Sequence, residues 1–132
     1  MTVEAMANLA TTPQAYQRGA VLAATPAELV VILYDGARRF LRQASAAMEA
    51  GEIERAHRTL RHAEMIVAHL NGTLDHEQGQ LAVSLGQLYT FCLRHLDDAR
   101  MEQNPEKLAE VSAMLGELRD AWAQIAAEAP RP

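Results

Sequence analysis

The chain has 132 residues, of which 49% are hydrophobic and only 5% are aromatic, and its formal net charge is −5. This is the length of one domain with a single buried core, and the hydrophobic content excludes wholesale disorder. The apolar residues are mostly helix-favouring types, and the aromatic residues typical of sheets are scarce, so the composition predicts an all-α fold. The negative charge disfavours nucleic acid as a partner, because phosphates attract clustered lysine and arginine.

The N-terminal sequence and the single cysteine both indicate the cytoplasm. The first four residues, beginning at Met1, lack the basic region and the long apolar stretch of a signal peptide. The longest strongly apolar run, from Leu29 to Tyr34, is too short to cross a bilayer, so we expect no membrane insertion. One cysteine, Cys92, cannot form an internal disulfide, which suits a reducing compartment, and we expect its thiol to lie in the core.

Residues 1–24 predict a loosely held N-terminal arm, because they carry a proline, a glycine and only scattered apolar side chains. A first helix is expected over residues 25–50. Its start has the pattern of a capping box, in which the side chain of Thr25 accepts from the Glu28 amide and Glu28 accepts from the Thr25 amide. Pro26 occupies the first helical position, where its missing N–H costs nothing, and Gly51 is expected to end the helix.

Three further helices are expected over residues 52–73, 79–104 and 105–127, followed by a tail at 129–132. Apolar residues recur in each at spacings of three and four, which places them on one helix face. The expected buried stripes are Ile53, Ala56, Leu60, Ala63, Val67 and Leu70; Leu81, Leu85, Leu88, Cys92 and Leu96; and Leu108, Val111, Leu115, Leu118, Trp122 and Ile125. Together with the first helix they predict an antiparallel up-down four-helix bundle over residues 25–128, with a flexible N-terminal arm.

A metal centre is disfavoured, although helical bundles often house one. A di-iron centre needs two Glu-x-x-His pairs, and this chain has one, formed by Glu54 and His57. His62, His69 and His76 follow one another at intervals of seven residues, which is about 10 Å along a helix and too far for one ion. No phosphate-binding loop or nucleophile elbow is present either, so we expect no cofactor and no enzymatic activity.

Two features indicate a surface for another protein. The six consecutive apolar residues from Leu29 to Tyr34 cover every side of a helix, so at least two of them must face something other than the core. Gly36, Gly86 and Gly116 lie within expected helices, where glycine costs up to about 1 kcal/mol relative to alanine. They are explained either by close contact between neighbouring helices or by a groove in which a partner helix approaches the backbone. The second apolar surface could be covered by the N-terminal arm, a dimer mate or a client protein.

Short segments distributed over residues 15–125 form a recognisable pattern. They are Ala15-Tyr16-Gln17, Val21, Ala24-Thr25-Pro26-Ala27-Glu28-Leu29, Leu33-Tyr34-Asp35-Gly36-Ala37, the turn from Glu49 to Ile53, Leu70-Asn71, Leu74-Asp75, Leu85, Leu88-Tyr89, Asn104-Pro105, Glu110-Val111, Leu115 and Ala121-Trp122. These segments resemble the signature of the FliS family, the flagellin-specific export chaperones of bacterial flagella. The chain departs from the family pattern in the loop at residues 77–80, which is one residue shorter, and at Thr90-Phe91.

The resemblance implies a cytoplasmic chaperone that binds the disordered C-terminal segment of flagellin and prevents premature polymerisation. It also implies delivery of the client to the export gate of the flagellar type III secretion apparatus. An amphipathic segment of this kind would fold on binding into an apolar groove. The residues expected to contact partners are Tyr16, Val21, Leu22, Val30, Leu33, Tyr34, Asp35, Gly36, Leu88, Tyr89 and Trp122.

Two further expectations concern how the apolar surface is covered. Tyr16, Val21 and Leu22 are close enough in the chain to the first helix to fold back over it as a lid, and Trp122 is expected on a buried stripe at the border of the groove. The alternative to the chaperone is a self-associating structural or adaptor bundle without a flagellin client, in which a homodimer buries the second apolar surface.

Overall fold

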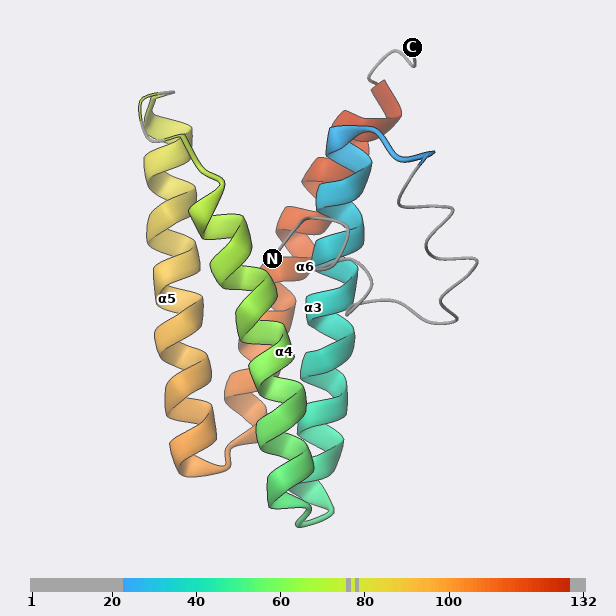
Figure 1. The fold of residues 1–132 in the computed structure, drawn as a ribbon. Coiled ribbons are helices and arrows are strands. Elements are labelled where there is room, and N and C mark those ends of the chain that lie inside the picture. Colours follow the sequence, from blue (N-terminus) through green and yellow to red (C-terminus); the bar gives the residue numbers. More distant parts are fainter. Residues whose placement is uncertain (1–22, 76, 78, 129–132) are drawn as a thin grey trace.

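The computed structural model describes residues 23–75, 77 and 79–128, and most of the predicted arm therefore lies outside the described residues. The described part forms four α-helices and no strand: α3 (Pro26–Glu49), α4 (Ile53–Gly72), α5 (Gln80–Glu102) and α6 (Pro105–Glu128). Successive helices run in opposite directions (Figure 1). α3 packs along α4 and α6, and α5 packs along the same two helices. The expected all-α, antiparallel four-helix bundle is confirmed.

The start of α3 is fixed by the capping box that the sequence predicts. The Glu28 amide donates to Thr25 Oγ1 at 3.2 Å, and the Thr25 amide donates to Glu28 Oε1 at 3.3 Å. These two bonds satisfy amides that the first turn of a helix leaves without a partner. Gly51, just past the helix end, has a φ of +75°, a left-handed conformation that glycine adopts without a steric penalty.

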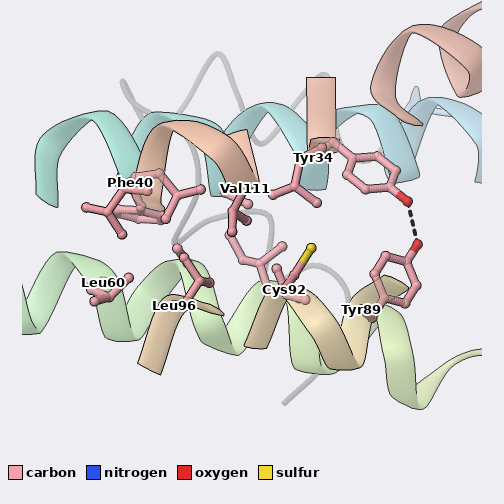
Figure 2. Close-up of a cluster of buried hydrophobic side chains, with 14 of the residues drawn as sticks. Tyr34, Phe40, Leu60, Tyr89, Cys92, Leu96 and Val111 are labelled. Carbon is pink, nitrogen blue, oxygen red and sulfur yellow. Dashed lines mark hydrogen bonds between the residues drawn. The ribbon is translucent and has the colours of Figure 1, made fainter. Parts of the chain in front are cut away.

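The core joins the inward faces of all four helices (Figure 2). Leu60, Leu96, Val111 and Leu115 are completely buried there, as the periodicity predicts. Alanines alternate with these larger side chains and let the helices approach closely. The alanines at most 1% exposed are Ala37, Ala44, Ala47, Ala56, Ala63 and Ala99.

The predicted stripes are wrong at the ends of the helices. Ile53, Leu81 and Ile125 are 65%, 73% and 49% exposed, and Leu118 and Trp122 are only partly buried. Ile53 and Leu81 lie in the first turns of α4 and α5, and Ile125 lies in the last turn of α6. Periodicity places a residue on a face, but burial also requires a neighbouring helix that extends as far.

The space beside Gly116 is filled by an arginine side chain from a neighbouring helix. A Cβ atom at this position would lie 2.9 Å from Cζ of Arg38, whose side chain crosses from α3 onto α6. Arg38 Nε also donates to Ser112 Oγ at 3.3 Å. The missing side chain of Gly116 therefore leaves room for a guanidinium of the same chain, and no partner is needed to explain it.

Cys92 is fully buried in the core, as expected. Burial disfavours the thiolate and raises the pKa of the thiol from 9.0 to about 11. A thiol in this environment is protonated at neutral pH and is a poor nucleophile.

The raised pKa of Cys92 predicts a loss of stability in alkali. Above about pH 9 the unfolded chain releases the thiol proton while the folded chain retains it, so the free energy of unfolding falls, by at most about 1.4 kcal/mol per pH unit. Cys92→Ala should flatten this fall between about pH 9 and 10, because the tyrosines that also begin to ionise there are present in both chains and contribute equally to the two slopes. Urea unfolding at several pH values measures the slope, which separates this effect from the packing lost in the variant. Equal slopes for both chains would contradict the prediction.

Candidate protein-binding site

An apolar pocket of about 300 Å³ opens at the end of the bundle where α5 begins and α6 ends. All four helices and the segment after α4 contribute to its wall. The lining residues are Val30, Leu70, Thr73, Leu74, Asp75, Leu81, Ala82, Leu85, Tyr89 and Trp122. Because Asp75 is the only charged residue among them, the pocket is suited to apolar side chains.

Two tyrosines join α3 to α5 beside this pocket. The hydroxyl groups of Tyr34 and Tyr89 form a hydrogen bond, and both side chains are at least 97% buried, with 0% and 3% exposed (Figure 2). Burial raises the pKa of both phenols, and the contact with Tyr89 raises that of Tyr34 further. The Trp122 indole, a hydrogen-bond donor, has the opposite and smaller effect on the pKa of Tyr34. Both hydroxyl groups are therefore neutral at physiological pH and act as a structural tie.

Trp122 is only partly buried, which corrects the expectation that it lies on a fully buried stripe. It packs against the core and also lines the pocket. Trp122 lies near the end of α6. Val30 and Leu85 line the pocket beside the indole but do not close the mouth of the pocket. Part of the indole surface is thus available to another molecule.

The remaining residues predicted to bind partners divide into three groups. Val30 and Tyr89 line the pocket together with Trp122. Leu33, Tyr34 and Gly36 are buried inside the bundle, and Leu88 is partly buried. Tyr16, Val21 and Leu22 lie outside the described residues.

Asp35 is engaged within the chain. Its Oδ1 atom lies 2.9 Å from Nε of Arg119 on α6, and this contact raises the pKa of the guanidinium. The side chains of Arg119 and Asp35 are 34% and 42% exposed, so the pair contributes no more than about 1 kcal/mol to stability. A partner that contacts Asp35 would have to share or break this pair.

Leu74 and Leu81 are pocket residues that sequence reasoning missed. Leu81 is expected on the core stripe of α5 and Leu74 at the frayed end of α4, whereas both line the pocket from either side of the α4–α5 connection. The signal that could have found them is the presence of two leucines flanking a polar turn, since neither end of such a turn is covered by a helix.

The described residues contain no cluster of three or more histidine, cysteine, aspartate or glutamate side chains that could hold a metal ion. Glu54 and His57 are exposed, and His62 packs edge-on against Phe40 with ring centroids 4.9 Å apart. Among the four helices, none is long and apolar enough to cross a membrane.

The fold and the pocket define a class, namely a small all-α bundle with an apolar surface open to another chain. Comparison with known proteins specifies it further. The family model described as "Flagellar protein FliS" matches residues 7–129. The flagellar secretion chaperone FliS of Bacillus subtilis is 38% identical over 110 residues, covering 83% of this chain and 82% of the relative. The Salmonella typhimurium protein of the same name is 32% identical over 112 residues, covering 83% of each chain.

A third relative, from Vibrio cholerae, also carries the name flagellar secretion chaperone FliS. It is 34% identical over 120 residues, covering 87% of this chain and 88% of the relative. The chain belongs to the FliS family of flagellar secretion chaperones. The resemblance noted in the sequence is confirmed.

The tyrosine pair predicts a coupled effect on stability. Tyr34→Phe or Tyr89→Phe removes one hydroxyl and leaves the other buried without its partner, so each should lower the free energy of unfolding by about 1–3 kcal/mol. The double variant should cost less than the sum of the single variants, because no hydroxyl is then left unpaired. Urea unfolding of the four chains measures the coupling. Strictly additive losses would show that the hydroxyl groups do not depend on each other.

Proposed function

We propose that this chain is a cytoplasmic chaperone that binds the disordered C-terminal segment of flagellin, prevents its premature polymerisation and delivers it to the flagellar type III export apparatus. Membership of the FliS family supports the flagellar role. The observation that carries the proposal is the open apolar pocket, because it brings Val30, Tyr89 and Trp122, three residues expected to contact the client, to one place.

The pocket fits an amphipathic helix better than an extended peptide. It lies among helix ends, and the described backbone around it contains no strand edge to which an extended segment could add. A client helix would insert apolar side chains from successive turns between Val30, Leu74 and Trp122. Leu33, Tyr34 and Gly36 are buried inside the bundle and would not touch the client. They would instead fix the shape of the pocket.

A peptide covering the last few dozen residues of flagellin should bind with a negative heat-capacity change and an increase in helix content. Trp122→Ala should weaken this binding at least tenfold, by about 1.4 kcal/mol or more, because the indole forms part of the pocket wall. Isothermal titration calorimetry and circular dichroism measure both effects. Absence of heat and of a helical signal at micromolar concentrations would contradict the proposal.

Ile53→Ala is the matched control for the Trp122 variant. Ile53 is also apolar and exposed, but it lies at the start of α4, at the opposite end of the bundle. Its replacement should leave flagellin affinity unchanged. Light scattering with and without the peptide tests the alternative, a self-associating bundle, which would form a stable homodimer that the peptide does not dissociate.

We further propose that residues 1–24 act as a lid that competes with flagellin for the apolar surface, and that Tyr16 contacts the export gate once the arm is displaced. The exposed apolar side chains of Leu81 and Ile125, at the same end of the bundle as the pocket, support a cover of this kind, since such surface favours aggregation when it is left open.

A chain beginning at Ala23 should therefore stay folded, bind flagellin peptide more tightly and be less soluble than the full chain. Hydrogen exchange on the full chain should be slower at Val21 and Leu22 without client than with it. The Tyr16→Ala variant separates the lid from the export gate, because it should retain flagellin binding while export falls. Unchanged affinity, solubility and exchange would rule the lid out.

A further inference from the structure

A second pocket, of about 470 Å³, lies on the outer side of α5 beside the end of α4. Its walls include Val83, Gln87, Phe91 and Arg94 of α5 and Asn71 of α4. Val83 and Phe91 are 38% and 48% exposed. Large apolar side chains at these positions are unexpected on the solvent side of a bundle helix, where polar residues normally lie.

This outer pocket is separate from the pocket proposed for flagellin. Leu85 and Tyr89 of α5 face the open end of the bundle, whereas Val83 and Arg94 line the outer pocket. Val83 precedes Leu85 by two residues, and Arg94 follows Tyr89 by five. At about 100° per residue, both positions are roughly half a turn away from the inward face. The two pockets therefore occupy opposite sides of α5.

The outer pocket is held in a defined shape. The Phe91 ring stacks on the His95 ring with centroids 5.1 Å apart, and His95 Nε2 lies 2.5 Å from Glu110 Oε2 on α6. Gly86 is buried and contributes no side chain, which lowers the floor of the pocket. A partner would meet a pre-formed surface and would pay little to order it.

Charge identifies the kind of partner. Arg94 is exposed and forms no ion pair among the described residues, and no carboxylate lines the pocket. One turn further along α5, Asp97 is paired with Arg100, and the exposed Asp98 lies outside the lining of the pocket. A cation without a partner beside exposed apolar side chains is complementary to a carboxylate beside an apolar stripe.

We propose that the outer face of α5 is a docking surface for an amphipathic helix of a second protein, one that carries a carboxylate next to its apolar side chains. The apolar side chains pack between Val83 and Phe91 over Gly86, and the carboxylate pairs with Arg94. Because this face points away from the flagellin pocket, the second protein can bind while a client is held.

Two labelled model peptides test this surface on the full chain. Both peptides form an amphipathic helix with the same apolar stripe. One peptide carries glutamate residues along the border of the stripe, and the other carries lysine residues at the same positions. The net charge of −5 would favour the lysine peptide at any non-specific surface. The proposed site should instead bind the glutamate peptide roughly five- to tenfold more tightly, a difference measured by fluorescence anisotropy.

Charge reversal supplies the decisive comparison. Arg94→Glu should invert the preference for the two peptides, and Phe91→Ala should weaken the binding of both. The matched control is Arg42→Glu, which reverses another exposed arginine without an ion pair among the described residues, on α3. It should change neither affinity. A preference for the lysine peptide, no binding of either peptide at millimolar concentration, or equal effects of the two arginine variants would overturn the proposal.

A final measurement separates this surface from the flagellin pocket. The glutamate peptide should remain bound when a flagellin C-terminal peptide is added in excess, and its displacement would overturn the claim of two surfaces. If the flagellin peptide itself fails to bind, the proposed client is wrong, whereas the charge-reversal result still decides the outer surface.

Discussion

The hydrogen bond between Tyr34 and Tyr89 spans the bundle from α3 to α5, two helices that do not follow each other in the chain. Both hydroxyl groups are buried, so their bond to each other replaces water that both lose on folding. On one side of this tie the core is filled by leucines, valines and alanines, and on the other side lies the open pocket, with Tyr89 in its wall. The hydrogen bond between the two tyrosines therefore holds α5 to α3 at the point along the bundle where the filled core ends and the pocket begins.

Polar contacts hold α5 to each of the other helices. Tyr89 bonds to α3, and Arg100 pairs with Glu64 of α4. His95 and Glu102 pair with Glu110 and Lys107 of α6. These contacts fix the rotation of a helix that has apolar residues on both its inner and outer sides. Hydrophobic packing alone does not determine which of these two faces of α5 is buried, because both are apolar. The polar contacts are directional, so they determine which face turns inward and leave Val83 and Phe91 on the surface.

Local signals in the sequence predicted the parts of the fold that local interactions determine. Thr25 and Glu28 bond to each other across a single turn, so their spacing was sufficient to locate the start of α3. The buried middle of each stripe was also predictable, because Leu60, Leu96 and Val111 are covered on every side by the other helices.

The ends of the bundle were not predictable in the same way. Leu81 and Trp122 follow the correct periodicity, but their exposure depends on how far the neighbouring helices extend. The contact between Tyr34 and Tyr89, 55 residues apart in the chain, depends on helix rotation as well. Candidate site residues carried over from family resemblance include residues that line the pocket, such as Val30 and Trp122, and residues buried beneath it, such as Leu33. No pattern in one sequence separates these two groups.

The size of the pocket sets a limit on what it can do for a disordered client. A space of about 300 Å³ accepts two or three aliphatic side chains, and each contributes about 1.5–3 kcal/mol when fully buried. Ordering a disordered segment costs about 2–5 kcal/mol or more, in addition to the entropy lost on association. The pocket alone would therefore leave little net affinity. A chaperone that holds such a segment needs contacts beyond the pocket, and this end of the bundle also exposes the apolar side chains of Leu81 and Ile125. A client bound over this length is held by many weak contacts and can be released stepwise from one end, without the hydrolysis of a nucleotide.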